Sequence, residues 1–236
     1  MISAPRKRLY REAGIEVAED RFAILLDGQR ARTPAKAPLE VPTRALALAI
    51  AAEFEAQGER VDPATMPMTR LAAIAIDLVA PRHAEIAAAV ANYAGTDLVC
   101  YRAEAPPALV ERQRLVWQPL VEWAARRFGA PLSVTAGVVP CAQPDASLAA
   151  LAAAVASCDA WALAALNLAT AACGSVVVAL ALAESVLGAD AAFAAAQLDE
   201  SYEIEQWGVD DEQQLRRDIL RDDIAAAARF LALLRG

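Results

Sequence analysis

Residues 22–34, FAILLDGQRARTP, decide the fold class, because they have the pattern of a β-hairpin in a chain that is otherwise helical in pattern. Phe22–Leu26 is a short apolar run typical of a strand. Asp27-Gly28 is a turn signal, since both central residues of the tight hairpin turn need positive φ. Gln29–Thr33 is the expected return strand, which Pro34 ends. The sequence therefore predicts a small antiparallel sheet near the N-terminus.

The segment after the hairpin has the spacing of a helix. VPTRALALAIAAEFEAQG places Leu46, Ile50 and Phe54 four residues apart, with Thr43 as the expected N-cap and Gly58 as the expected end. Further along, the pattern predicts helices over residues 70–79, 82–93, 97–102, 107–128, 145–157, 159–173, 175–187, 190–207 and 211–234. Residues 130–140, APLSVTAGVVP, are expected to be a strand or an extended crossing.

These elements predict an α+β protein. A small N-terminal domain, rich in antiparallel β-structure, is expected over residues 1–62, and a larger orthogonal helical bundle over residues 63–236. Hydrophobic residues make up 57% of the chain and aromatic residues only 6%, a mixture dominated by alanine that favours closely packed helices.

Charge and cysteine usage exclude several classes of function. The net charge of −8 argues against nucleic acid as a partner, because phosphate binding needs a basic face. The four cysteines form no Cys-x-x-Cys pair and there is one histidine, His83, so neither a metal site nor a cofactor is expected. No phosphate-binding loop and no nucleophile elbow is present.

The uncharged run Ala160–Ala183 is long enough to span a bilayer, yet a membrane span is not expected. It is rich in alanine, its flanks are acidic, and Cys173-Gly174-Ser175 has the pattern of a break between two shorter helices. The first residues lack the apolar segment of a signal peptide. The expected location is therefore the bacterial cytoplasm, or the mitochondrial matrix for a processed organellar protein.

Residues 198–208, LDESYEIEQWG, are the first candidate for a functional site. On a helical wheel Glu200 lies within an apolar stripe formed by Phe193, Ile204 and Trp207. A carboxylate there either pairs with an arginine such as Arg216 or Arg217, or belongs to a binding surface. Trp207 likewise is either a partner anchor or a core side chain beside the end of a helix. Both alternatives stay open at this point.

The same segment carries the main candidate for acid–base chemistry, because His83 follows Pro81 at a helix start and is expected to be a surface or capping residue. Asp199, Glu200, Glu203 and Glu205 lie close together in sequence, as in a carboxylate-based enzyme or a small-molecule site. No electrophile or metal-binding motif accompanies them, and a solvated acidic helix face explains the cluster more simply. No catalytic residue is assigned, and a binding protein is the favoured class.

Several stretches occur in an order that resembles a known family. They are KRLY, LDGQRARTP, PLEVPTRALALAIAAEFEAQ, MPMTRLAAIAID, YAGTDLVCYRAEAP, LVWQPLVEW and LDESYEIEQWG. Together they resemble the Atp-twelve family of ATP synthase assembly chaperones, which handle the alpha subunit of the catalytic head. The resemblance covers nearly the whole chain. Phe54 departs from it, because a Glu-Trp pair is usual there, and so does the segment after Gly208.

The resemblance implies a non-enzymatic chaperone that binds the unassembled alpha subunit of ATP synthase. A monomer is expected, because a chaperone's apolar surface must stay free for its client. It also implies the fold already predicted, a small α+β domain followed by a helical bundle. The family's acidic helix ending in Trp-Gly falls on Leu198–Gly208 of this chain. The partner-binding residues that this match implies are Glu200 first, with Asp199, Glu203, Trp207 and Gly208.

Overall fold

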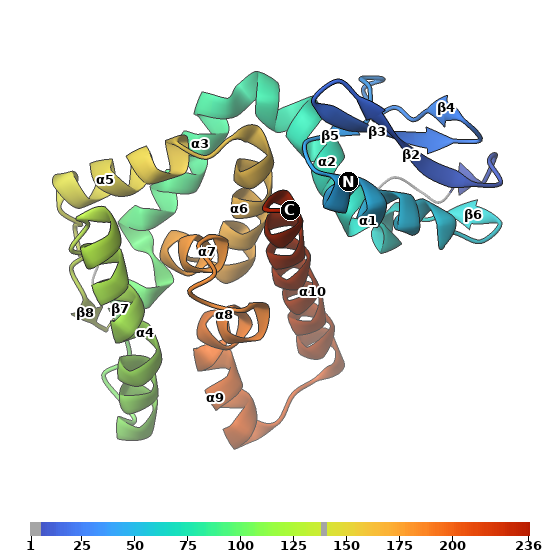
Figure 1. Cartoon of the computed structure of the whole chain (residues 1–236). Coiled ribbons are helices and arrows are strands. Elements are labelled where there is room, and N and C mark those ends of the chain that lie inside the picture. The colour runs from blue at the N-terminus through green and yellow to red at the C-terminus, as the bar shows by residue number, and fades with distance from the viewer. Residues whose placement is uncertain (1–5, 138–140) are drawn as a thin grey trace. The chain divides into compact units, whose positions relative to one another are not determined.

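The structure is a computed structural model that describes residues 6–137 and 141–236 (Figure 1). The described chain forms two compact units. The first runs to His83 and adds Ala160–Ala165 and Arg229–Gly236, and the second holds Ala84–Asp159 and Leu166–Ala228 within the described residues. A small antiparallel sheet region followed by a helical region confirms the predicted α+β class. The domain boundary after residue 62 stays a prediction.

The N-terminal unit is built around a four-stranded antiparallel sheet. β3 (Arg21–Leu26) pairs with β2 (Ala13–Ala18), β4 (Gln29–Arg30) and β5 (Glu40–Val41). Leu26 faces Gln29 across the predicted turn, where Asp27 and Gly28 have φ values of 48° and 75°. The Asp-Gly hairpin is therefore confirmed, although its return strand ends at Arg30 rather than at Thr33.

Helix α1 (Arg44–Glu55) packs on β2 and β3 (Figure 1). Thr43 is its N-cap, as predicted, and accepts a hydrogen bond from the Leu46 amide at 3.2 Å. Leu46 and Ile50 are completely buried and form the core beneath the sheet. The helix ends at Glu55, three residues before the predicted stop at Gly58, because Ala56 already closes its last turn.

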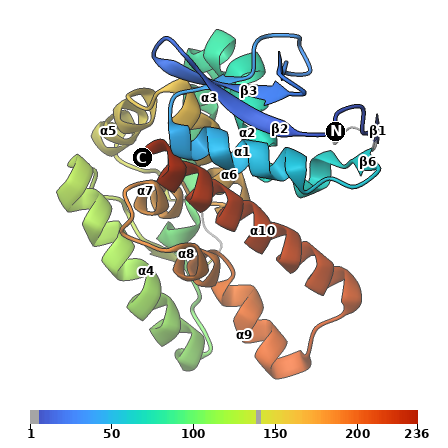
Figure 2. The same ribbon diagram turned by 45° about the vertical axis from the view of Figure 1, so that its right-hand side comes forward.

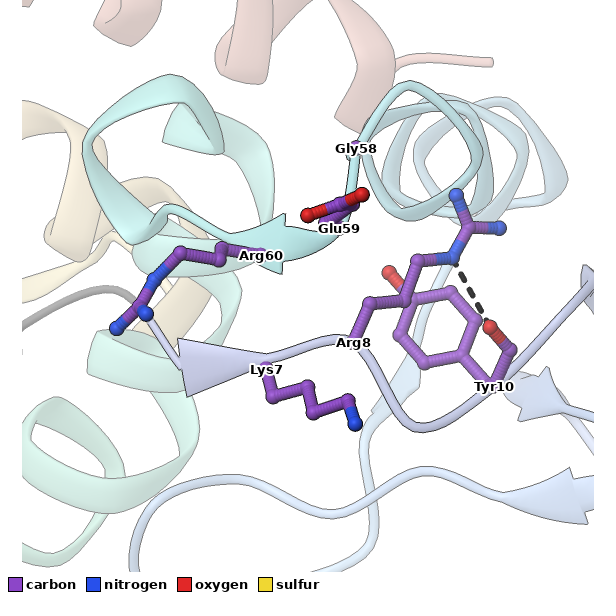
Figure 3. A pocket seen from close by; sticks show the side chains of 6 residues that line it. All are labelled: Lys7, Arg8, Tyr10, Gly58, Glu59 and Arg60. Atoms are coloured by element: carbon purple, nitrogen blue, oxygen red, sulfur yellow. Dashed lines mark hydrogen bonds between the residues drawn. The ribbon is translucent and has the colours of Figure 1, made fainter.

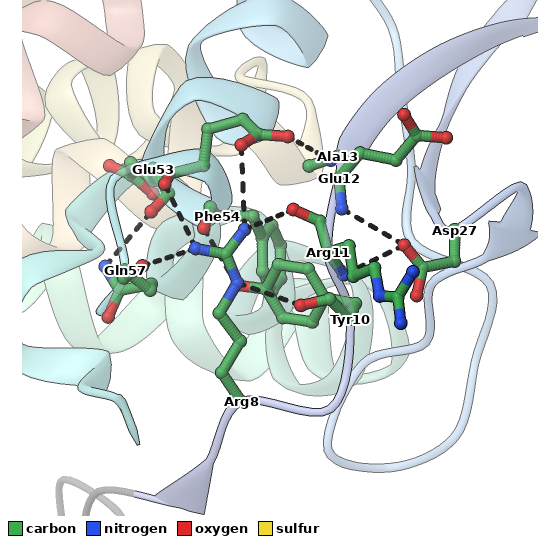
Figure 4. Close-up of polar contacts among 10 residues, drawn as sticks. Arg8, Tyr10, Arg11, Glu12, Ala13, Asp27, Glu53, Phe54 and Gln57 are labelled. Carbon is green, nitrogen blue, oxygen red and sulfur yellow. Dashed lines mark hydrogen bonds and ion pairs between the residues drawn. The ribbon is translucent and has the colours of Figure 1, made fainter. Parts of the chain in front are cut away.

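The start of the described chain is tied to the end of α1 through Arg8 (Figure 4). β1 (Arg6–Lys7) pairs with β6 (Arg60–Val61), and the Arg8 guanidinium donates to the carbonyl oxygens of Tyr10 at 3.0 Å, Arg11 at 2.7 Å and Gln57. These bonds help to hold β1 in place, because a two-residue strand makes too few backbone hydrogen bonds to be stable by itself.

Glu53 joins α1 to the next helix, α2 (Pro67–Ile74). Its carboxylate is 9% exposed and accepts from the Met68 amide at 2.7 Å, the Thr69 amide at 2.8 Å and the Thr69 hydroxyl at 2.7 Å. Negative charge at a helix N-terminus is favourable, because the first amides lack partners within the helix. α2 therefore begins three residues before the predicted start at residue 70.

A π-helical turn (Ala75–Val79) and a 3-10 turn (Ala80–Arg82) follow α2. Other 3-10 turns occupy Pro63–Thr65 and Asn92–Thr96. The later helices are α3 (His83–Ala91), α4 (Pro107–Phe128), α5 (Asp145–Ala156), α6 (Ala160–Cys173), α7 (Val176–Ala183), α8 (Ala189–Ala196), α9 (Leu198–Trp207) and α10 (Asp211–Leu234). The bounds of α4 and α10 are those predicted.

Residues 97–102 do not form the predicted helix. A 3-10 turn over Leu98–Cys100 leads into β7 (Tyr101–Arg102), which pairs in parallel with β8 (Thr135–Ala136). β8 confirms an extended segment within 130–140, of which residues 138–140 lie outside the described part. The apolar pattern before Tyr101 is that of a buried turn, in which Val99 and Cys100 are fully buried.

The long uncharged run divides into two core helices, as predicted. α6 ends at Cys173, Gly174 adopts a φ of 62°, and Ser175 caps α7 by accepting from the Val178 amide at 3.0 Å. Residues Val176–Leu182 are all buried. Within the described residues, no helix combines the length and the apolar character needed to cross a membrane.

Candidate functional site

The segment predicted as one helix over residues 190–207 is two helices, α8 and α9, which meet at Gln197 (Figure 2). Gln197 is 7% exposed and leaves the helical conformation, with φ −111° and ψ 28°, while its side-chain oxygen accepts from Arg217 at 3.3 Å. The predicted stripe from Phe193 to Glu200 is therefore wrong, because the two residues lie on different helices. Glu200, Ile204 and Trp207 keep their helical spacing on α9.

Trp207 is 80% exposed, so the alternative of a core tryptophan is wrong. Gly208 follows it and donates its amide to the Ile204 carbonyl at 2.8 Å, which closes the helix. The φ of 85° and ψ of −177° at Gly208 belong to a region that is almost restricted to glycine. Gly208 thus ends α9 and reverses the chain toward α10, and it leaves the indole of Trp207 at the turn between the two helices.

Glu200 is partly exposed and makes no hydrogen bond or ion pair with any residue in the described ranges. The predicted alternative of a pair with Arg217 is not found. That guanidinium donates to the Ser201 hydroxyl at 3.0 Å and lies 5.3 Å from the Phe193 ring centroid. The Glu200 carboxylate is therefore available to a group from another molecule.

Asp199 points inward, toward α4. Its carboxylate accepts from the side-chain amide of Gln113 at 2.8 Å, and Gln113 is itself 1% exposed. The pKa of Asp199 is raised above its usual value, mainly by burial and further by Glu203. The Gln113 hydrogen bond and Arg102 lower this pKa but do not outweigh burial. The Gln113 side-chain oxygen also accepts from the Ala103 amide at 2.7 Å. Asp199 therefore fixes the orientation of α9 on α4.

A second contact between α4 and α9 lies at the surface. Arg112 donates to both carboxylate oxygens of Glu205, at 2.7 and 2.6 Å, and its guanidinium lies 5.3 Å from the Tyr202 ring centroid. An exposed pair of this kind stabilises a protein by no more than ~1 kcal/mol. Its effect on the site is to engage Glu205 within the protein, whereas Glu203 is exposed.

The surface around this site is strongly acidic. Residues 199–223 contain ten carboxylates and three arginines. Two of the arginines, Arg217 and Arg221, lie 5.3 and 4.5 Å from the Phe193 ring centroid and so belong to the packing of α10 on α8. The combination of an exposed indole with unpaired carboxylates suits a partner that carries both apolar and basic groups.

The alternative of a carboxylate-based enzyme or small-molecule site gains no support from the geometry. Asp199 accepts a hydrogen bond from Gln113 and Glu205 is paired with Arg112, so two of the four carboxylates are already engaged within the protein. The described residues hold no cluster of three or more histidine, cysteine or acidic side chains that is arranged to bind a metal. A depression of about 570 Å³ lies elsewhere, in the N-terminal unit, and is lined by residues that include Lys7, Arg8 and Arg60 (Figure 3).

Comparison with known proteins identifies a family and relatives that are similar to this chain. The family model described as "ATP12 chaperone protein" matches residues 7–125. Protein atp12, mitochondrial, of Schizosaccharomyces pombe is 24% identical over 235 residues, which cover 94% of this chain and 81% of that protein.

Two solved structures are similar over almost the whole chain. Atp12 from Paracoccus denitrificans is 42% identical, with a TM-score of 0.93 and coverage of 98% of this chain and 99% of that chain. The Atu1473 protein of Agrobacterium tumefaciens is 41% identical, with a TM-score of 0.90 and coverage of 97% and 86%. This chain therefore belongs to the ATP12 family of chaperones, which act in ATP synthase assembly.

Proposed function

We propose that the chain binds the unassembled alpha subunit of ATP synthase and keeps it soluble until it joins beta. The observation that carries this proposal is the exposed Trp207, which lies two helical turns from the unpaired carboxylate of Glu200. Large aromatic side chains supply most of the affinity at many protein interfaces. A single exposed apolar side chain is ordinary on a protein surface. The support for a partner is the combination of an indole that is 80% exposed with the Glu200 carboxylate, which has no partner among the described residues.

The carboxylates give the surface selectivity and allow release. An unassembled alpha subunit exposes an apolar interface that later meets beta, and a chaperone must cover it reversibly. Glu200 and Glu203 add charge recognition of a basic or amide group, which speeds encounter and disfavours wrong partners. Asp199 and Gly208 act indirectly in this proposal, since the first orients α9 and the second sets the turn after Trp207.

The protein acts as a monomer and without enzymatic turnover in this proposal. A chaperone that used its apolar surface for self-association would lose the surface needed for its client. No step of binding or release requires a bond to be broken, so affinity and competition with beta are sufficient to drive the cycle.

The proposal is tested by measuring the dissociation constant between this protein and immobilised, purified alpha subunit. Trp207→Ser is expected to weaken binding at least tenfold, equivalent to ~1.4 kcal/mol, and Glu200→Gln several-fold. Val186→Ser is the matched control, because Val186 is also apolar, 48% exposed and in the same unit. Unchanged binding by Glu200→Gln would show that Glu200 does not contact the alpha subunit. Equal effects of Trp207→Ser and Val186→Ser would refute the proposal that the surface around Trp207 binds it.

A further inference from the structure

Helix α10 also carries exposed apolar side chains, in addition to Trp207 at the end of α9. Leu215 is 62% and Ile219 53% exposed, and the two lie four residues apart on one side of the helix. Exposed aliphatic residues occur singly on most proteins, but a pair on adjacent turns is a local apolar strip. We call the strip and its neighbours Glu212 and Asp222 the α10 outer face.

The outer face points away from the packing of its own unit. Arg217 contacts Gln197 and Ser201, and Ile224 is completely buried, so the side of the helix that carries these two residues is the inner one. At 100° per residue, Leu215 and Ile219 are each about 160° from Arg217 around the helix axis. Among the described residues of the C-terminal unit, no element covers the strip.

Carboxylates border both aliphatic residues. Asp211 and Glu212 precede Leu215 by one helical turn, and Asp222 follows Ile219 by one turn. Each of these three side chains makes no hydrogen bond or ion pair with a described residue. Arg216 is the adjoining cation, so the face carries excess negative charge.

We propose that the α10 outer face docks an amphipathic helix of a protein partner that carries lysine or arginine beside its apolar side chains. The apolar strip supplies burial and the bordering carboxylates supply charge complementarity. The same charge disfavours the other occupants of an apolar face. An anionic lipid surface or nucleic acid is repelled, and a second copy of this chain brings its own acidic face to the contact.

The test uses the full chain and two synthetic helical peptides with identical leucine positions, one with lysine and one with glutamate at the polar positions. Binding of the fluorescein-labelled peptides is followed by fluorescence anisotropy. We expect the leucine–lysine peptide to bind at least tenfold more tightly than the leucine–glutamate peptide. We also expect its affinity to fall as salt is raised, because charges beyond about 10 Å are screened at 0.1 M.

Variants locate the contact. The double variant Leu215→Ser/Ile219→Ser is expected to weaken binding of the leucine–lysine peptide tenfold, and Glu212→Gln/Asp222→Asn to weaken it and flatten its salt dependence. Val186→Ser is again the matched control. All these side chains are exposed, so we expect each variant to keep the fold. Circular dichroism of each variant checks this expectation.

Several results would overturn the proposal. They are equal binding of both peptides, no binding of the leucine–lysine peptide, or unchanged binding by the Leu215→Ser/Ile219→Ser variant. A concentration-dependent dimer that this variant abolishes would instead assign the face to a second copy. Sedimentation with phosphatidylglycerol vesicles that the variant abolishes would assign it to lipid. The assay contains no alpha subunit, so its outcome is independent of the alpha-binding proposal.

Discussion

The buried carboxylate of Asp97 makes a sharp prediction about the pH dependence of stability. Asp97 is completely buried and accepts from the Val99 amide at 3.2 Å, the Ser175 hydroxyl at 2.5 Å and the Val177 amide at 3.1 Å. It thereby joins the turn before β7 to the N-terminus of α7. Burial raises the pKa of Asp97 to about 6, although the hydrogen bonds from Ser175 and the backbone amides lower it.

The sign of the effect follows from the two pKa values. An unfolded aspartate has a pKa of about 3.9, so the folded protein binds a proton more tightly than the unfolded chain. The stability that protonation of Asp97 provides is present below about pH 4 and is lost as the pH rises through about 6. A difference of about two pKa units at ~1.36 kcal/mol each corresponds to ~3 kcal/mol.

The assay is urea unfolding of the wild type and of Asp97→Asn from pH 4 to pH 7.5. The variant cannot titrate at this position, so the wild-type free energy of unfolding minus that of the variant isolates the Asp97 effect. We expect this difference to fall by ~2.4 kcal/mol as the pH rises across the range, because the rest of the effect lies below pH 4. The constant offset between the two proteins, which reflects the changed hydrogen bonds of the amide, does not enter the slope.

Asp27→Asn is the contrasting control. Hydrogen bonds from the Glu12 and Arg11 amides lower the pKa of the exposed Asp27, so its contribution has the opposite sign and is lost as the pH falls. If the Asp97 difference is flat, or grows with pH, the surrounding donors outweigh burial and the reasoning about Asp97 is refuted.

Three further substitutions test the supports of the fold and the site. Glu53→Ala leaves the Met68 and Thr69 amides without their acceptor and should lower the free energy of unfolding by about 3 kcal/mol in urea titrations. An unchanged free energy of unfolding would show that Glu53 does not cap α2. Gln113→Ala removes the donor to Asp199 and should lower stability by ~2 kcal/mol, while an equal loss on an Asp199→Ala background, which has no acceptor, would show that the two do not interact. Gly208→Ala should cost ~1–3 kcal/mol through backbone strain alone, since no atom lies within 4 Å of an added Cβ; hydrogen exchange at the end of α9 should rise, and unaltered exchange would contradict this.

Local signals explain which elements were predictable from the sequence. The Asp-Gly turn and the Thr43 cap are decided by residues within the element itself, and both are confirmed. Pro107 marks the start of α4 in the same way, since proline is favoured in the first turn. Such features need no knowledge of the tertiary fold.

Non-local contacts explain the failures. The strand at Tyr101–Arg102 exists because it pairs with Thr135–Ala136, more than thirty residues later. The break at Gln197 accompanies a contact with Arg217 from α10. In each case the helical pattern was present in the sequence and tertiary pairing overrode it.

The candidate site was only partly predictable for the same reason. The acidic helix that ends in Trp207-Gly208 is evident in the sequence, but its exposure is not, because a buried and an exposed tryptophan give the same pattern. Arg112 and Gln113, which hold α9 on α4, are 93 and 86 residues from their partners, and no sequence motif marks them.

The most direct test of the central claim is size-exclusion chromatography of this protein mixed with the unassembled alpha subunit, before and after beta is added. We expect a stable one-to-one complex with the alpha subunit, from which beta releases the chain. Failure to co-elute, with the alpha subunit aggregating as fast as it does alone, would contradict the account of this protein as an alpha-subunit chaperone.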